Sequence, residues 1–359
     1  MPELKKITVR NFKSIRTLDE FELHSLNLLI GANGAGKSNF ISLFDMLAAM
    51  TAKRLQLFVA EHDGPDALLF GTRKRSEEMA LEFYFARNGY RLTLRPTGER
   101  FVFAREETWF GGDFLDSSHA LGSGHEEARL ADVENDTFTP YVRPALADWR
   151  VYHFHDTSIS ARVRQASAVR DNLRLKPDAG NLAPFLRHLY EGYPEHYLRI
   201  IETVRKAAPF FGDFVYRRDV GEQVELEWYS MDDPDTVRGP RQLSDGTLRF
   251  ICLATLLMQP SPLQPSTILI DEPELGLHPY ALSLIGALLR QASNSRQIIV
   301  STQSADLVSE FDPEDVVVVQ NREGASVFER LQSERLAAWL DDYSLGELWR
   351  MNILGGRPE

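Results

Sequence analysis

Residues 31–38, GANGAGKS, decide the fold of this chain. A glycine followed after four residues by Gly-Lys-Ser is the pattern of a phosphate-binding loop. In such a loop backbone N–H groups surround a phosphate, Lys37 reaches its oxygens and the Ser38 hydroxyl ligates Mg²⁺. Apolar spacing predicts a strand at residues 26–30 and a helix from residue 41 onward. A glycine turn without a ligand is the alternative, but the strand–loop–helix order is the one that phosphate binding requires.

The remaining hydrophobic pattern predicts an α/β fold. Alternation at period two indicates early strands near residues 7–9 and 21–23 and an antiparallel meander over 77–105. Residues 111–138 are rich in glycine, serine and acids without periodicity, which predicts a long surface loop. Helical spacing begins at about residue 159 and continues to 208. Further buried strands or helices are expected at residues 149–155, 248–258, 268–271, 297–302 and 315–321.

Composition excludes several classes of protein. The 40 basic and 52 acidic residues leave a net charge of −12, so any contact with nucleic acid must be a local patch. Cys252 is the only cysteine, which excludes an intramolecular disulfide and a multi-cysteine metal site. The N-terminus has no signal-peptide pattern, and no window has the ~18 apolar residues of a membrane helix. We therefore expect a cytoplasmic protein that does not enter a membrane.

Two further motifs suggest parts of a nucleotide site. In ILIDEP, residues 268–273, an apolar strand ends in two acids: Asp271 is placed to hold the Mg²⁺ shell and Glu272 to polarise an attacking water. Acids that cap the following helix are the alternative. In LSDGT, residues 243–247, Ser244 is a good N-cap residue for the apolar helix that follows, which is the simpler reading of a short motif.

The order of these motifs resembles that of the ABC ATPase superfamily. The similar branch contains the RecF, SMC and OLD-type ATPases and the small stand-alone ATPases of bacteria. The resemblance covers residues 1 to about 320 and implies an ABC-type ATPase head of the P-loop NTPase class, with ATP and Mg²⁺ as cofactors. It also implies head-to-head dimers that hold two ATP molecules and separate after hydrolysis. The resemblance rests on the segments ITVRNFKSI, GANGAGKSNF, LSDGT, IDEPELGLHP and STQSADLV.

The resemblance assigns roles to individual residues. Glu272, Lys37 and Gln303 are the expected catalytic residues, and Ser38 and Asp271 the expected metal-binding residues. Lys13 lies where a basic residue contacts nucleotide phosphates in DNA-repair members, although a solvated lysine at a strand end is the alternative. Ser244 and Gly246 are expected to bind the ATP of the partner chain. The further residues expected to bind nucleotide are Asn33, Gly34, Ala35, Gly36 and Asn39.

The chain departs from the family pattern at three places. Gln303 stands where many members have a histidine that senses the γ-phosphate, and glutamine cannot take a proton, so hydrolysis is expected to be slow. Transporter-type members have an aspartate-bearing dimer loop where this chain has Gly276-Leu277-His278-Pro279, as OLD-like ATPases do, and His278 either contacts nucleotide or caps the helix that begins at Pro279. The usual glutamine loop is not recognisable. Its expected substitute is the segment His155, Asp156 and Thr157.

The resemblance also suggests a division of the chain. An antiparallel β subdomain and a helical lobe are expected on the head, and the lack of a heptad run predicts no long coiled coil. We expect an ATPase head at 1–320 and a C-terminal tail at 321–359 packed on the core. Within the head, the nucleotide-binding core comprises 1–158, including the meander at 77–105, and 235–320. The helical lobe with a hairpin insertion comprises 159–234.

Three functions compete at this point. The first is an ATP-gated dimerising switch that acts on DNA or on a separately encoded effector, for example a nuclease, in genome maintenance or phage defence. The second is the ATPase subunit of a membrane transporter, and the third is a nucleotide-binding scaffold with negligible turnover. The basic stretch 161–176 is a candidate nucleic-acid or partner patch, or simply a solvated helical face.

Overall fold

A mostly parallel sheet lies at the centre of the computed structural model, which describes residues 3–111, 117–133, 139–217 and 221–356. Its strand order is β17-β16-β3-β15-β14-β8, and β17 alone pairs antiparallel to its neighbour. The strand expected before the glycine loop, at residues 26–30, and all of the later buried strands expected from apolar runs take part in this sheet. The strands are β3 (Leu26–Ile30), β8 (Trp149–Tyr152), β14 (Thr267–Asp271), β15 (Gln297–Thr302), β16 (Val316–Arg322) and β17 (Ala325–Arg330).

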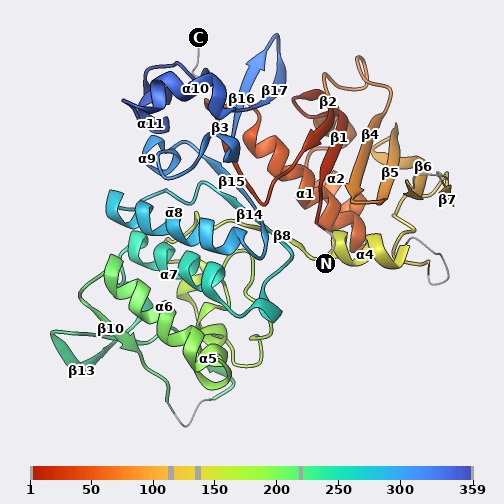
Figure 1. Cartoon of the computed structure of the whole chain (residues 1–359). Helices are drawn as coiled ribbons and strands as arrows, with labels where there is room; N and C mark the ends of the chain where they lie inside the picture. Colours follow the sequence, from red (N-terminus) through yellow and green to blue (C-terminus); the bar gives the residue numbers. More distant parts are fainter. Residues whose placement is uncertain (1–2, 112–116, 134–138, 218–220, 357–359) are drawn as a thin grey trace.

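The central sheet separates two hydrophobic cores. Side chains alternate between the faces of a strand, so Leu28 and Ile30 pack into one core and Leu29 packs into the other. Figure 1 shows helices α5 to α8 on one side of this sheet, and α1 with a second sheet on the other. Burial on both faces explains why these strands are continuous apolar runs rather than alternating ones.

The second sheet is antiparallel and follows the order β2-β1-β4-β5-β6-β7. The predicted meander is confirmed, but the long loop expected at 111–138 is wrong in part, because residues 117–122 pair with β6 at the sheet edge. Residues 112–116 and 134–138 of that segment lie outside the described part. The elements are β1 (Lys6–Phe12), β2 (Ile15–Glu22), β4 (Met79–Phe85), β5 (Asn88–Thr97), β6 (Arg100–Phe110), β7 (Ser117–Gly122), α1 (Lys37–Thr51), α2 (Leu55–Glu61), α3 (Pro65–Leu68) and α4 (Thr139–Ala147).

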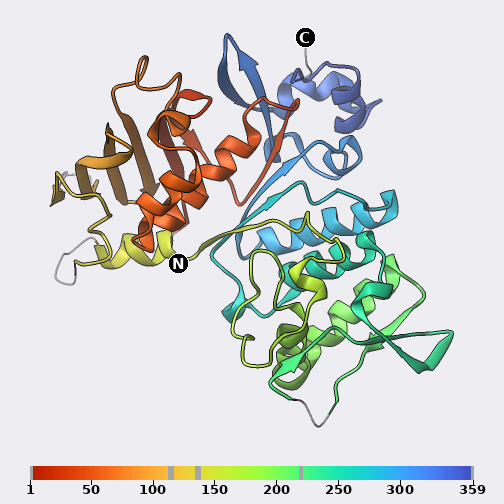
Figure 2. The same ribbon diagram turned by 180° about the vertical axis from the view of Figure 1, so that it is seen from behind.

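The other side of the central sheet, seen from behind in Figure 2, carries α5 and α6 of the expected helical lobe at 159–234 together with α7 and α8 of the expected core. Its four longer helices pack in the core that also contains Phe185 and Phe250. Two small antiparallel sheets lie beside them: β12 pairs with both β10 and β13, and β9 pairs with β11. The elements are α5 (Leu182–Gly192), α6 (Pro194–Ala207), α7 (Asp245–Met258), α8 (Pro279–Ser293), β9 (Ser167–Ala168), β10 (Phe211–Phe214), β11 (Gln223–Val224), β12 (Trp228–Ser230) and β13 (Asp233–Arg238).

Residues 159–181 are not the helix that their apolar spacing predicts. An irregular path contains a 3-10 turn, Arg162–Arg164, and the two-residue strand β9. The fully buried Asn181 organises this path, because its side-chain amide donates to the carbonyls of Asp171 and Arg174 and its oxygen accepts from the Lys176 N–H. Local side-chain hydrogen bonds of this kind compete with helix formation.

The C-terminal residues return to the phosphate loop. Leu345 and Leu348 are buried in the same core as α7, and the Ala32 N–H donates to Gly356 O at 2.7 Å. No helix of the described residues exceeds the 15 residues of α1 and α8, and none among them combines the length and apolarity of a membrane span. The remaining helices are α9 (Ala305–Val308), α10 (Ser333–Leu340) and α11 (Leu345–Arg350), with 3-10 turns at Pro240–Gln242, Ser261–Leu263 and Pro313–Asp315.

Candidate nucleotide-binding site

The phosphate loop connects β3 to α1, and its conformation requires glycine. Gly34 and Gly36 have φ values of +77° and +111°, which L residues with a side chain rarely adopt. At Gly36 a Cβ would also lie 2.0 Å from the Ser326 hydroxyl oxygen. A side chain at position 36 is therefore excluded both by the backbone conformation and by β17, a strand nearly 300 residues further along the chain.

Lys37 lies against the loop that precedes it. Its ammonium donates to Gly31 O at 2.6 Å and to Ala32 O at 3.1 Å. Only 5% of the residue is exposed, and this burial lowers the pKa of the amine, while the nearby carboxylates of Glu272 and Asp271 act in the opposite direction. The lysine thus stands between the loop and the two acids of the ILIDEP motif.

The other expected contact residues of the loop fall into two groups. Asn33, Gly34 and Ser38 are exposed, and the first two line a hollow of about 590 Å³ beside β16. Ala35 is buried, and its carbonyl accepts from the Ser326 hydroxyl at 2.6 Å. The side chain of Asn39 donates to the Ser14 hydroxyl at 2.7 Å, so it connects the start of α1 to the turn between β1 and β2.

The carboxylates are at the same edge of the sheet as the loop. Asp271 ends β14 opposite Ser301 in β15, and the next residue, Thr302, is opposite Ile30, directly before the loop. Because these strands are parallel, their carboxyl ends form one edge, where ligands of α/β sheets bind. Asp271 Oδ1 is buried and has no hydrogen-bond partner among the described residues. An unpaired carboxylate oxygen of this kind fits a bound cation.

Glu272 and Gln303 contact each other at this edge. Glu272 has a left-handed backbone, φ +43°, and its carboxylate accepts a hydrogen bond from the Gln303 side-chain amide. The Gln303 N–H donates to Glu274 Oε1 at 2.6 Å, and burial raises the pKa of Glu274. Sequence reasoning did not single out Glu274, although it lies in the ELGLHP segment. Only its side-chain contact marks it.

Of the segment expected to replace the glutamine loop, His155 reaches the backbone of Asp271 at the end of β14. Its Nε2 lies 2.8 Å from the carbonyl oxygen of Asp271. Asp156 is exposed and accepts from the Ser158 N–H, while Thr157 is buried and its carbonyl accepts from Arg164. The three residues therefore have different surroundings.

Lys13 lies along α1 from the phosphate loop. Its ammonium donates to the Ser42 hydroxyl at 2.6 Å, and Ser42 is one helical turn beyond Ser38 on the same face. Burial lowers the pKa of Lys13, partly offset by Asp45. The lysine is thus neither a freely solvated side chain nor in contact with the loop itself.

The LSDGT segment does not meet the phosphate loop within one chain. Ser244 caps α7 by accepting from the Thr247 N–H, and a Cβ on Gly246 would lie 2.4 Å from Gly276 O. Ser244 and Gly246 line a hollow of about 140 Å³ with His278, which itself caps α8. This hollow shares no lining residue with the two hollows that border residues 31–35.

Two buried arginines connect the LSDGT segment to the carboxylate edge. Arg164 donates to the carbonyls of Thr157 and Leu243 and to Asp245. Arg249 of α7 donates to Phe154 O and His155 O, both at 2.8 Å, and to Leu275 O. Sequence reasoning placed Arg164 in a basic patch or on a solvated helical face, and both interpretations fail for this buried side chain.

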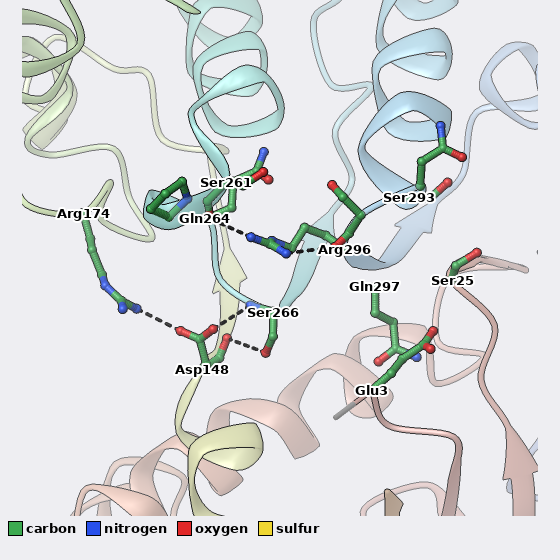
Figure 3. Close-up of a pocket in the computed structure, with 13 residues that line it drawn as sticks. Glu3, Ser25, Asp148, Arg174, Ser261, Gln264, Ser266, Ser293, Arg296 and Gln297 are labelled. Atoms are coloured by element: carbon green, nitrogen blue, oxygen red, sulfur yellow. Dashed lines mark hydrogen bonds and ion pairs between the residues drawn. The ribbon is translucent and has the colours of Figure 1, made fainter. Parts of the chain in front are cut away.

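The other charges of the stretch 161–176 are largely paired. Arg174 donates to Asp148 at 2.9 Å and Lys176 to Asp171. Figure 3 shows the Arg174–Asp148 pair in a hollow of about 490 Å³ that also contains Arg296. Its polar groups bond to one another, Arg296 to Ser261 O for example. None of the expected site residues lines it.

Comparison with known proteins identifies similar ATP-binding proteins. A family model described as "AAA domain, putative AbiEii toxin, Type IV TA system" matches residues 26–309. A putative ABC transporter ATP-binding protein of Geobacter sulfurreducens is 33% identical over 86 residues, 24% of this chain and 32% of that protein. The DNA replication and repair protein RecF of Desulforudis audaxviator is 29% identical over 157 residues, 41% of this chain and 42% of that protein. The chain thus matches less than half the length of either relative.

Solved structures agree over nearly the whole chain. An SMC head bound to the C-winged helix domain of ScpA has a TM-score of 0.63 at 18% identity, covering 93% of this chain and 99% of that one. An SMC head with an extended coiled coil, bound to the C-terminal domain of ScpA from Pyrococcus furiosus, has a TM-score of 0.56 at 16% identity, covering 95% and 99%. At these identities the likeness establishes the fold, that of an ABC-type ATPase head.

Proposed function

Because the chain belongs to the AAA-domain family described as putative AbiEii toxin, and is an ABC-type ATPase of the RecF and SMC kind, we propose that it is an ATP-hydrolysing switch that dimerises when it binds nucleotide. The observation that carries the proposal is the separation of the two half-sites. The phosphate loop and the carboxylates share one edge of the sheet, whereas Ser244 and Gly246 line a different hollow. A second chain, placed by a two-fold axis, supplies the missing half of each site.

The phosphate half-site contains the groups that hydrolysis needs. Lys37 and the loop amides bind the phosphates, and Ser38 with the unpaired Asp271 oxygen would hold Mg²⁺. That ion, when bound, offsets the charge of the phosphates. Glu272 orients the attacking water, and Gln303 holds its carboxylate through the side-chain amide. Because Gln303 takes no proton, we expect turnover to be slow.

We further propose that the switch acts on DNA or on a separately encoded effector such as a nuclease. One relative is named a DNA replication and repair protein, and the similar SMC heads are bound to a partner protein. The process that we propose for it is genome maintenance or defence against foreign DNA. We expect the protein to act in the cytoplasm, because its single, buried cysteine, Cys252, suits a reducing compartment.

Two substitutions test the two-chain site. Glu272→Gln keeps the shape of the side chain and removes the charge that orients water, so this variant should bind ATP and accumulate as a dimer. Adding Ser244→Arg places a bulky cation where the partner's phosphates would lie, and should return the protein to a monomer with ATP affinity changed no more than a few fold. The matched control is Ser118→Arg, an exposed serine on β7 at the far edge of the antiparallel sheet.

Light scattering with and without ATP and Mg²⁺ decides between the outcomes. A dimer that forms only with nucleotide, persists in the Ser118→Arg control and is lost with Ser244→Arg supports the proposal. An oligomer that does not depend on ATP, or a dimer unaffected by Ser244→Arg, contradicts it. Wild-type phosphate release in Glu272→Gln would show that this glutamate is not the catalytic group.

A further inference from the structure

A serine of the last strand contacts the phosphate loop from outside. Ser326 of β17 is 2% exposed, and its hydroxyl oxygen lies 2.6 Å from Ala35 O in the loop. Sheet order explains the contact: β16 runs parallel to β3, with Val318 opposite Ile30, so the loop that leaves β3 passes the end of β16. Ser326 pairs with Asn321 at that end. The family model ends at residue 309 and therefore assigns no role to β17.

The Ser326 hydroxyl belongs to a chain of hydrogen bonds that has one direction. Both Ala35 O and the Ser14 hydroxyl oxygen lie within reach of its single proton, at 2.6 and 2.7 Å. A carbonyl can only accept, so Ser326 donates to Ala35 and the Ser14 hydroxyl donates to Ser326. Ser14 accepts in turn from the Asn39 side chain. The chain thus runs from α1 through two serines back to the loop, and each bond strengthens the next.

The bond to Ala35 O determines where the next amide points. Ala35 and Gly36 share a trans peptide unit, in which the C=O and the N–H point in opposite directions. Because the carbonyl faces β17, the Gly36 N–H faces away from that strand. Glycine adopts many backbone conformations, so this peptide unit could otherwise rotate at little cost. Rotation would leave the buried Ser326 hydroxyl without its acceptor, which is unfavourable.

The loop binds phosphate through its backbone N–H groups, so the direction of each amide affects affinity. We propose that Ser326 is a positioning residue, which holds the Ala35–Gly36 peptide unit so that the Gly36 N–H is presented to a nucleotide phosphate. Ser326 itself does not contact the nucleotide. The inference rests on the proposed nucleotide binding at the loop. It concerns an interaction made equally before and during hydrolysis, so its loss raises KM and changes kcat little.

Binding of a fluorescent ATP analogue to the full chain in Mg²⁺ tests this role. Ser326→Ala removes the hydroxyl, and ATP affinity should fall about five-fold or more. Ser326→Thr keeps a hydroxyl and should restore most of the affinity. The matched control is Ser230→Ala, because Ser230 is 4% exposed and its hydroxyl also donates to a carbonyl, Phe210 O at 3.0 Å, but in the helical lobe. Its affinity for the analogue should equal that of the wild type.

Thermal melting of each variant separates a loss of stability from a loss of binding. Should Ser326→Ala not fold, Ser326→Cys gives the same comparison, because a thiol has a similar shape and donates only weakly. Wild-type affinity in the Ser326 variant that folds, or an equal loss of affinity in Ser230→Ala, overturns the positioning role. A wild type that does not bind the analogue refutes the proposed nucleotide site itself, which distinguishes the two failures.

Discussion

Replacing Arg249 with methionine should uncouple the helix behind the LSDGT segment from the carboxylate edge. The guanidinium is buried, and it donates to the carbonyl oxygens of Phe154, His155 and Leu275. Methionine keeps most of the aliphatic volume but provides no donor, so these three acceptors lose their partner. Burial lowers the pKa of Arg249, and desolvation of a buried cation costs free energy that its hydrogen bonds must offset.

The structure bounds the size of the effect. A hydrogen bond from a charged group contributes about 1.5–3 kcal/mol. Two of the three contacts are only partly buried, so water can reach those acceptors after the change. Allowing for the recovered desolvation of the guanidinium, we expect the free energy of unfolding to fall by about 2–4 kcal/mol. With an unfolding entropy of roughly 0.75 kcal/mol per kelvin for a chain of this length, the melting temperature should fall by about 3–5 °C.

Calorimetric melting of the variant, with Arg335→Met as the control, measures this. Arg335 is 70% exposed and 3.6 Å from Glu329, so its loss should change stability by less than about 0.5 kcal/mol. ATP affinity of Arg249→Met should remain within a few fold of the wild type, because Arg249 does not contact the phosphate loop, while ATP-dependent dimerisation should weaken. A melting temperature equal to that of the control would refute the argument that these carbonyls depend on Arg249.

Three further predictions concern the nucleotide site and the core. Lys37→Ala should abolish binding of a fluorescent ATP analogue, and undiminished binding would refute the whole assignment. Gly36→Ala should destabilise the protein more than Gly34→Ala in thermal melting, because both have positive φ but only at Gly36 would the new methyl meet the Ser326 hydroxyl. Burial raises the pKa of Cys252 to about 12, so iodoacetamide at pH 8 should leave the folded protein unmodified and label it in urea, as read by mass spectrometry.

Much of the fold could be predicted because the signals are local. The apolar run before the glycine loop and the helical spacing after it depend on neighbouring residues, and β3 and α1 follow them. The helix expected from residue 159 is absent because the buried Asn181 satisfies three backbone groups of its own loop, a local side-chain effect that apolar periodicity does not record. β7 was missed because an edge strand that buries little has weak alternation.

The sequence by itself determined the class of the protein and the chemistry at the start of the site. GANGAGKS specifies its own conformation through glycines that tolerate positive φ, and ILIDEP specifies a buried strand ending in acids. These motifs also carried the resemblance to ABC ATPases that the family model confirms.

The tertiary structure alone decided which residues meet. The contact of Gln303 with Glu272, the support of the phosphate loop by Ser326, and the convergence of His153 and His155 on Asp271 join residues between 31 and more than 290 positions apart. The order of parallel strands creates these contacts, because it brings the carboxyl ends of distant segments to one edge. A pattern along the chain records spacing between neighbours, whereas proximity across a sheet depends on strand order, which no local pattern contains.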